Sequence, residues 1–207
     1  MSNIQGTEAW HKSRLGRVTA SRISDVMAKT KTGPSASRKN YMMQLLCERL
    51  TKRKEEGFTS AAMIRGTELE AIARSAYEVD KGVMVQEVGF VPCLPIDMAG
   101  ASPDGLVGDD GLIEIKCPNT AQHVEFLRTS KIDPGYEYQM LFQMICTGRA
   151  WCDFVSFDDR LPEELQYKCI RFHYNHAEAS KIINEVRAFL DDLAQLENEL
   201  KNIQEAA

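Results

Sequence analysis

The chain has 207 residues, 30 acidic and 25 basic side chains, and a formal net charge of −5. This length suits one domain with a sizeable core, and the acidic balance argues against indiscriminate coating of nucleic acid. No apolar run could span a membrane, the N-terminus MSNIQGTEAW shows no signal-peptide pattern, and the six cysteines include no C-x-x-C pair. We expect a single cytoplasmic domain over residues 1–207, with reduced thiols and without zinc or an iron–sulfur cluster.

Charge is distributed unevenly along the chain, so an acidic protein could still contain a local basic channel. The basic residues of the N-terminal third include Lys12, Arg14, Arg17, Arg22, Lys29, Lys31, Arg38 and Lys39. The acidic residues of the C-terminal segment include Glu185, Asp191, Asp192, Glu197 and Glu199. We expect the N-terminal third to supply any such channel.

The stretch WHKSRLGRVTAS, from Trp10 to Ser21, mixes aromatic and basic residues. Thr19 or Ser21 is expected to cap a helix that contains Ile23. Arg14 beside such a helix start could form a phosphate pocket with backbone N–H groups and hydroxyls. Taken alone, an exposed arginine beside a routine cap is the commoner explanation.

Residues 30–39 predict a polar, mobile loop that could contact a nucleic-acid backbone. Amphipathic helices are expected at 41–50 and 60–79, joined by a charged connector at 51–58. The buried stripe of the second helix would comprise Ala62, Leu69, Ile72, Ala73, Ala76 and Tyr77. Glu70 lies near this stripe and could reach a metal ion, although a solvated carboxylate is the commoner role of a helical glutamate.

A strand is predicted over 83–92, and residues 96–99 lead from it into a hairpin. The hairpin strands are expected at 105–108 and 112–116, where apolar and polar residues alternate in the second strand. The loop Asp109-Asp110-Gly111 ends in glycine, which suits a type I turn followed by a left-handed residue.

This three-residue loop decides which side chains of the hairpin share a face. It pairs Leu106 with Glu114 and Asp104 with Lys116. Side chains two apart in a strand point the same way, so Asp104, Glu114 and Lys116 would lie together. A two-residue loop would shift the pairing by one and send Asp104 to the other face.

Asp104, Glu114 and Lys116 are residue types that suit metal-assisted hydrolysis of a phosphodiester. Two carboxylates repel unless a cation lies between them, and Mg²⁺ takes one or two carboxylates beside its waters. The metal can polarise the phosphoryl oxygen and activate water, while Lys116 can hold or deprotonate that water and stabilise developing charge. The alternative is a surface hairpin with a solvated Glu–Lys pair, because an x-E-x-K tetrad often occurs by chance.

The rest of the chain alternates helix and strand. Residues 136–145 (YEYQMLFQMI) predict a helix with Gln139 and Gln143 one turn apart on one face. Strands are predicted at 151–157 and 166–172, and a long amphipathic helix at 177–204. The four histidines show no ligand spacing and receive no role. The order of elements predicts an α/β domain with a mixed central sheet flanked by helices.

Four motifs now stand in order: AWHKSRLGRVTAS, RGTELE, SPDG…EIKCP and YEYQMLFQ. Together they resemble the phage lambda exonuclease family, the YqaJ-type viral recombination nucleases of the PD-(D/E)XK class. The resemblance covers the chain from Trp10 to about Phe157. It implies one nuclease domain with a basic, helical part at 1–80, a catalytic sheet core at 81–175 and a C-terminal helix at 177–204.

The resemblance implies an active site with two Mg²⁺ ions, for which Mn²⁺ should substitute. The metal ligands would be Asp104, Glu114, Glu70 and the main-chain oxygen of Ile115. Lys116 and Gln139 would complete the catalytic set. The spacing Gly66-Thr-Glu-Leu-Glu70 matches the family's Gly-x-x-x-Glu motif and selects Glu70 over Glu68.

The same family grips a 5′-phosphate and separates the terminal base pair. Those roles imply a DNA-contacting set of Trp10, Arg14, Ser21, Ser102, Lys31 and Met63, in which Met63 is the wedge and Lys31 lines a channel. The family wedge is usually leucine, and the loosely matching Asp97 receives no role. The family's enzymes are homotrimeric rings that degrade one strand of duplex DNA from its 5′ end to mononucleotides. The 3′ overhang passes to a single-strand-annealing protein, which implies a phage or prophage origin in a bacterial host.

Two other functions stay open on the sequence. A structure-specific or restriction-type endonuclease of the same class would use the same catalytic set, but Arg14 with Ser21 favours an enzyme that binds ends. A catalytically inactive DNA-binding scaffold is disfavoured because Asp104, Glu114 and Lys116 are all present.

Overall fold

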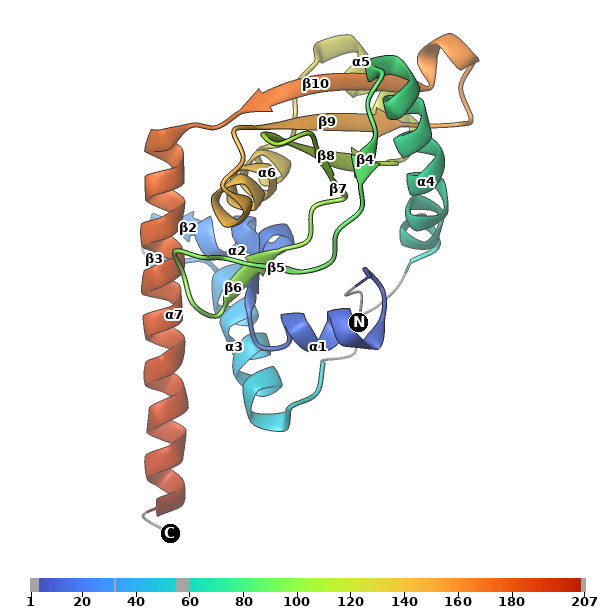
Figure 1. Ribbon diagram of the computed structural model, residues 1–207. Coiled ribbons are helices and arrows are strands. Elements are labelled where there is room, and N and C mark those ends of the chain that lie inside the picture. Colours follow the sequence, from blue (N-terminus) through green and yellow to red (C-terminus); the bar gives the residue numbers. More distant parts are fainter. Residues whose placement is uncertain (1–3, 32, 55–59, 206–207) are drawn as a thin grey trace.

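The largest sheet of the protein has five strands and mixed pairing. The computed structural model describes residues 4–31, 33–54 and 60–205. The strand order is β10-β9-β8-β7-β4, with β8 and β9 parallel and the other neighbours antiparallel. The bounds are β4 Val85–Gln86, β7 Gly105–Val107, β8 Gly111–Lys116, β9 Trp151–Phe157 and β10 Tyr167–His173. This sheet forms the upper part of the molecule in Figure 1.

Two smaller sheets lie below it. One has the order β1-β6-β5, and the other is a hairpin of β2 and β3. The bounds are β1 Val18–Thr19, β2 Lys29–Thr30, β3 Gly33–Pro34, β5 Val91–Pro92 and β6 Ala99–Ala101. Because β6 leads directly to β7, the chain passes from the small sheet into the large one at residues 102–104.

Helices pack against these sheets on several sides (Figure 1). Their bounds are α1 Glu8–Arg14, α2 Ile23–Met27, α3 Ala36–Thr51, α4 Ala61–Lys81, α5 Thr120–Thr129, α6 Pro134–Thr147 and α7 His176–Glu205. Short 3₁₀ turns occupy Ala20–Arg22 and Glu163–Leu165. Among the described residues, no helix is long and apolar enough to cross a membrane. The expected mixed α/β fold is confirmed.

The central strand β8 is buried along most of its length, including the charged Glu114, although apolar and polar residues alternate in it. Ile113 and Ile115 belong to the core cluster that contains α4. Leu112 belongs to the other cluster, which contains α6 and α7. Because alternate side chains of a strand point to opposite faces, Glu114 and Lys116 lie on the same side as Leu112, toward α6.

The hairpin register differs from the predicted one by two residues. Leu106 pairs with Leu112, and the loop is Gly108-Asp109-Asp110. Gly108 takes the left-handed conformation, with φ +53°. Gly111 instead lies in the strand, where a Cβ would stand 2.1 Å from the ring of Trp151. The shift is an even number, so Asp104 keeps the expected face.

The N-terminal elements correct three expectations. Neither Thr19 nor Ser21 caps α2 through its side chain, because a 3₁₀ turn precedes that helix and Arg22 occupies its N-cap position. Residues 30–39 include part of the β2–β3 hairpin and the start of α3, whose cap is Ser35. Arg38 is buried rather than available to DNA, since it donates to the carbonyl of Val26 at 2.7 Å.

Other boundaries also differ from the prediction. The single strand expected over 83–92 is two short strands in different sheets. Helix α5, capped by Asn119, was not predicted. In α4, Ala62 and Ile72 are exposed although the predicted stripe would bury them. Residues 55–58 of the expected connector lie outside the described residues. The six cysteines are free thiols, as expected.

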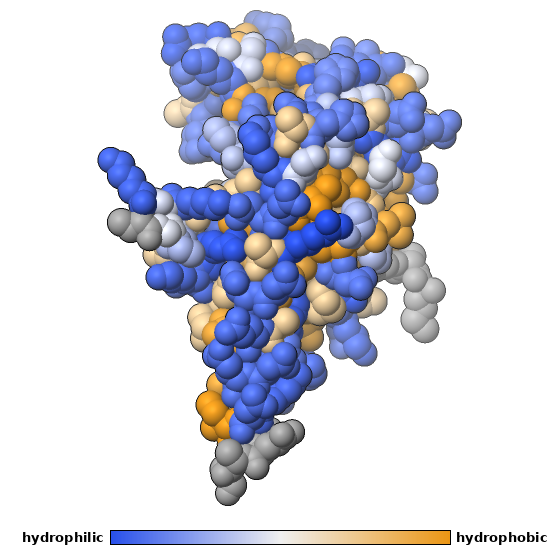
Figure 2. Space-filling view, turned by 90° about the vertical axis from the view of Figure 1, so that its left-hand side faces the viewer, coloured by the Kyte–Doolittle hydropathy of each residue, from blue (hydrophilic) through white to orange (hydrophobic). Residues whose placement is uncertain are grey.

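The long helix α7 extends well beyond the body of the protein (Figure 1). Its first half packs into the core through Ile182, Val186 and Phe189. Leu200, which the predicted stripe would bury, is 41 % exposed. Hydrophilic side chains cover most of the projecting part in Figure 2.

Candidate active site

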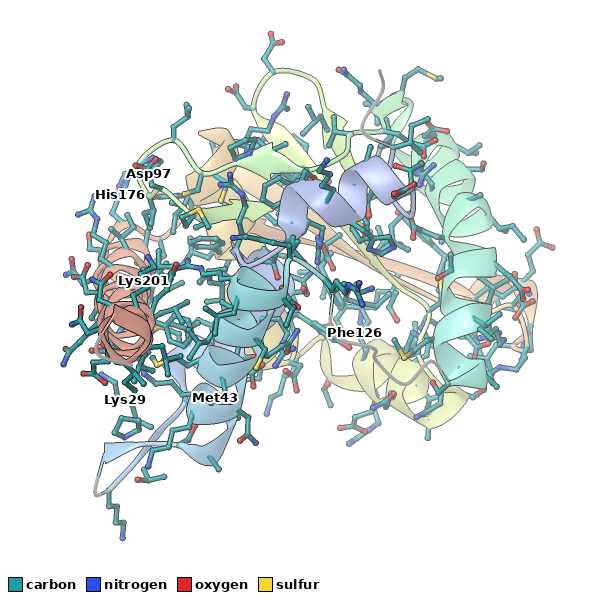
Figure 3. The ribbon with its side chains drawn as sticks, turned by 90° about the horizontal axis from the view of Figure 1, so that it is seen from below. Lys29, Met43, Asp97, Phe126, His176 and Lys201 are labelled. Atoms are coloured by element: carbon teal, nitrogen blue, oxygen red, sulfur yellow. The ribbon has the colours of Figure 1, made fainter. Side chains whose placement is uncertain are left out.

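A cavity of about 780 Å³ opens where β8 ends and brings nearly all predicted site residues together. Its lining includes Trp10, Arg14, Ser21, Met63, Glu70, Ser102, Asp104, Glu114, Ile115, Lys116 and Gln139. Lys31 is not among the lining residues, because it lies in the turn between β2 and β3. Figure 3 shows that hairpin, beside the labelled Lys29, extending away from the rest of the chain.

Asp104 stands in the turn before β7 and faces the end of β8. Its Oδ2 accepts the backbone N–H of Ile115 at 2.7 Å. Burial raises the pKa of Asp104 well above its usual value, and Glu114 and Glu70 raise it further, while Lys116 opposes them. This crowding of carboxylates favours either a bound proton or a bound cation.

The turn that carries Asp104 is held from two sides. Gln5, near the N-terminus, donates to the carbonyl oxygen of Pro103 at 2.9 Å. A Cβ on Gly105 would stand 2.1 Å from Cγ1 of Val85, so β4 leaves room only for glycine after the aspartate. The sequence offered no signal for Gln5, because its contact is with a residue far along the chain.

Glu114 is almost completely buried and receives three donors. Oε1 lies 2.5 Å from Nζ of Lys116 and accepts a hydrogen bond from Nε2 of Gln139 at 2.6 Å. Oε2 accepts a hydrogen bond from Nε2 of Gln143, also at 2.6 Å. The two glutamines therefore share one face of α6, as the one-turn spacing predicted, and both serve the same carboxylate.

Lys116 is held as an ammonium ion. Burial lowers its pKa, but the neighbouring carboxylates of Glu114 and Asp104 outweigh burial and raise the pKa above the usual value. The ring of Tyr136 lies 4.9 Å from Nζ and adds a cation–π contact. The lysine therefore presents a positive charge to the cavity at neutral pH.

Glu70 projects from α4 toward the same group, whereas Glu68 is exposed and does not line the cavity. Oε1 of Glu70 accepts a hydrogen bond from Arg74 at 2.9 Å. Arg74 also forms an ion pair with Glu87 at 2.7 Å. Burial raises the pKa of Glu70 and Arg74 opposes that shift. The i,i+4 spacing of Glu70 and Arg74 in the sequence could have predicted this ion pair.

A second group of polar side chains lies at the α1 side of the cavity. The guanidinium of Arg14 stacks 4.2 Å from the ring centre of Trp10. Trp10 Nε1 and Arg14 Nη1 both donate to Oγ of Ser102, at 2.9 and 3.0 Å. Because both acceptor positions of the hydroxyl are filled, its own proton is left for a third partner. Ser21 lines the same cavity with an exposed side chain.

Met63 lies in the first turn of α4, with 58 % of its surface exposed at the cavity rim. Arg65 follows on the same helix and pairs with Asp158 at 3.0 Å and with Asp159. Arg160 also pairs with Asp158 and lines the cavity. These ion pairs connect the start of α4 to the turn after β9.

The model of the YqaJ-like viral recombinase domain family matches residues 9–150, which include all the site residues above from Trp10 to Gln143. The chain belongs to this family. A crystal structure of an alkaline exonuclease (LHK-Exo) from Laribacter hongkongensis is 52 % identical, with 97 % of this chain and 99 % of that chain covered and a TM-score of 0.91. The same protein in complex with dAMP gives a TM-score of 0.92.

A phage-related exonuclease from Haemophilus somnus 129PT shares the fold, with 17 % identity and a TM-score of 0.68 over 89 % of this chain and 96 % of that one. A search of curated proteins gave no significant match. The expected family resemblance is thereby confirmed, and helix α7 lies outside the part that the family model matches.

The donor set at β8 suits a hard divalent cation. Among the described residues, no three acidic, histidine or cysteine side chains converge as a complete metal-binding group. Mg²⁺ does not require one, because it keeps several waters and takes one or two carboxylates. The adjacent, mutually repelling carboxylates of the half-buried Asp104 and the buried Glu114 meet that requirement.

Proposed function

We propose that this protein is a Mg²⁺-dependent 5′→3′ exonuclease of double-stranded DNA. It degrades the 5′-phosphorylated strand to mononucleotides and leaves a 3′ overhang for single-strand annealing. The observation that carries the proposal is the single cavity that contains both the Arg14–Ser102 group and the Asp104–Glu114–Lys116 group. The 52 % identical alkaline exonuclease supports the reaction class.

Asp104, Glu114, Glu70 and the main-chain oxygen of Ile115 would hold Mg²⁺, and Mn²⁺ should substitute. When bound, the metal would polarise the scissile phosphate and lower the pKa of an attacking water. Lys116 lies 2.5 Å from Glu114 at the edge of the cavity. It would hold or help to deprotonate the attacking water and stabilise the negative charge that develops on phosphate.

The group around Arg14 would bind the terminal 5′-phosphate. The guanidinium lies against the Trp10 ring, and Ser102, whose Oγ accepts two hydrogen bonds, can donate its hydroxyl proton to a further acceptor. A phosphate oxygen provides that acceptor and a charge-assisted partner for arginine. Anchoring the 5′ end beside the catalytic group selects the strand that is cut and the direction of degradation.

Met63 is exposed at the rim and would wedge between the bases of the terminal pair. Its flexible side chain can fill the gap that a leucine fills in related wedges. Gln139 would help to orient the attacking water from its place beside Glu114. Lys31, on the projecting hairpin, would contact the DNA backbone at a distance from the cavity.

The protein would act as a closed ring of three identical subunits around the DNA, in concert with an annealing protein. A head-to-tail ring joins two different patches of each subunit and so needs no self-complementary surface. The N-terminal third is rich in basic residues and the C-terminal segment in acidic ones. Lys29 and Arg38 already pair with Glu185 and Asp192 of α7 within one chain, so a contact between subunits would have to use the remaining charges. Enclosure would let the enzyme stay on one strand over many cycles.

The exonuclease and the endonuclease alternative differ in their need for an end. We expect the protein with Mg²⁺ to degrade linear duplex with a 5′-phosphate and to leave a covalently closed circle of the same sequence intact. Electrophoresis of both substrates over the same time course tests this. Linearisation of the circle would favour the endonuclease.

A further inference from the structure

Gln143 is a polar residue in a position that core packing alone would fill with an apolar one. It lies on α6 between the buried Phe142 and Met144 and is fully buried itself. Its Nε2 donates to Glu114, but its Oε1 has no hydrogen-bond partner among the described residues. A buried unpaired polar atom costs about 1–3 kcal/mol. A leucine would avoid that cost, so packing does not explain the glutamine.

Glu114 is held differently at its two oxygens. Within the described part of the chain, the hydrogen-bond donor to Oε2 is Gln143, which is enclosed in the core and cannot swing away. Oε1 is shared by Gln139 and Lys116, whose side chains are partly exposed at the cavity. An arriving cation could therefore displace the donors on Oε1, while Oε2 stays fixed.

Glu70 shows the same arrangement on the opposite helix. Arg74 donates to its Oε1, and Oε2 accepts no hydrogen bond from the residues that the structure describes. The Arg74 side chain is only 13 % exposed, and its buried Nε also lacks a partner in the described part of the chain. An ordinary exposed i,i+4 ion pair stabilises a helix by only about 0.3–0.5 kcal/mol. That gain is too small to explain why Arg74 is buried with an unpaired guanidinium nitrogen.

We propose that Gln143 and Arg74 are positioning residues, each fixing one oxygen of a carboxylate so that the other oxygen faces the cavity and a divalent cation. This inference rests on the proposed function, which assigns Glu114 and Glu70 as cation ligands. Groups that orient metal ligands through hydrogen bonds typically change metal affinity by about 10–100-fold when removed. Neither residue touches the DNA or the metal in this role.

Calorimetric titration of the protein with Ca²⁺ tests the inference without turnover. Gln143→Leu should weaken Ca²⁺ binding about tenfold or more. In a Glu114→Gln background the same substitution should have no further effect, because the carboxylate that Gln143 positions is gone. Gln195→Leu is the matched control, since Gln195 donates to Glu199 on exposed α7 far from the cavity. Should the leucine variant fail to fold, Gln143→Met provides the same loss of the donor with an unbranched side chain.

Arg74→Gln should likewise weaken Ca²⁺ binding about tenfold, and only when Glu70 is present. Arg74→Lys keeps a positive charge and a donor, so its Ca²⁺ affinity should lie between those of the parent protein and Arg74→Gln. A purely structural role for the guanidinium would not produce this order of affinities. Arg128→Gln removes an exposed helical ion pair with Glu125 and should bind Ca²⁺ normally.

Two failures of the inference are distinguishable. Unchanged Ca²⁺ affinity in Gln143→Leu and Arg74→Gln, with weakened binding in Glu114→Gln and Glu70→Gln, would overturn the positioning roles and leave the proposed function in place. Unchanged affinity in Glu114→Gln and Glu70→Gln would instead remove the ligand assignment on which both proposals rest.

Discussion

Asp104 reaches across the hairpin to accept the backbone N–H of Ile115 at 2.7 Å. The bond ties the turn before β7 to the end of β8, so the aspartate carboxylate stands beside Glu114 and Lys116 in space although ten or more residues separate them in sequence. Three ionisable groups therefore have fixed places before any ligand arrives, which is the preorganisation that electrostatic catalysis requires.

Lys116→Ala should lower the single-turnover cleavage rate by about 100-fold or more, because one preorganised charge is removed from the transition state. Binding of DNA ends in Ca²⁺ should change little, since the lysine acts mainly on the developing charge. Lys181→Ala, on exposed α7, is the control. A Lys116→Ala enzyme with normal turnover would show that the catalytic group lies elsewhere.

Removal of the 5′-phosphate from linear duplex should slow the start of degradation, because Arg14 and Ser102 lose their charged partner. Arg14→Ala should start slowly on both kinds of end, so the discrimination disappears. The control is Arg187→Ala, an exposed arginine that donates to the carbonyl of Pro95. Equal initiation on 5′-hydroxyl and 5′-phosphate ends by the unmodified enzyme would contradict the pocket.

The binding of duplex DNA should weaken as salt rises, even though the chain is acidic, because local charge releases counterions. Lys31→Gln with Lys39→Gln should flatten the plot of log affinity against log salt by about 0.9 for each phosphate that the variant no longer neutralises. Arg38→Gln should instead destabilise the fold, because Arg38 is buried and bonded to Val26. An unchanged slope in the lysine variant would place the DNA path away from Lys31 and Lys39.

Light scattering at moderate salt should give the mass of three chains. A contact between copies would bury exposed apolar residues such as Met43, which is 50 % exposed. On the same helix, Leu46 is buried in the core and Met42 is half-buried, so neither is as available for such a contact as Met43. A mass of one or two chains under conditions of full activity would rule out the ring.

Asp158→Asn should lower the free energy of unfolding at pH 7. Burial raises the pKa of Asp158, but hydrogen bonds from Arg160 and Thr120 outweigh burial and hold it well below its usual value. A carboxyl with a depressed folded pKa contributes stability above its unfolded pKa, near 3.9, and loses it as the pH falls further. Urea unfolding should therefore show a large difference between parent and variant at pH 7 that shrinks in strong acid. A difference independent of pH would contradict this.

The sequence predicted correctly those features that depend on residues close together in the chain. Strand β9, at Trp151–Phe157, matches its expected bounds, and the one-turn spacing of Gln139 and Gln143 placed both on one face. The hairpin face was also predicted, because it depends only on whether the register shift is even or odd. The exact register was not, since it depends on the ring of Trp151 against Gly111, a contact between distant residues.

The remaining errors have the same origin. Arg38 looked like a free cation in a polar stretch, but the packing of α3 encloses it. Ile72 looked like core, but it lies on the outer face of α4. Gln5 contacts Pro103, which is distant in sequence, so the sequence alone could not indicate this hydrogen bond. The i,i+4 spacing of Glu70 and Arg74 is visible in the sequence, but only the fold shows that the pair lies at the cavity.

The central claim is that recognition of the 5′ end is coupled to metal-assisted hydrolysis. The most direct test is to identify the product formed from a linear duplex with one labelled 5′-phosphate. With Mg²⁺ we expect labelled mononucleotide as the first product, an intact complementary strand, and no product when Ca²⁺ replaces Mg²⁺. Labelled oligonucleotides, or loss of nucleotides from the 3′ end first, would contradict the proposed exonuclease.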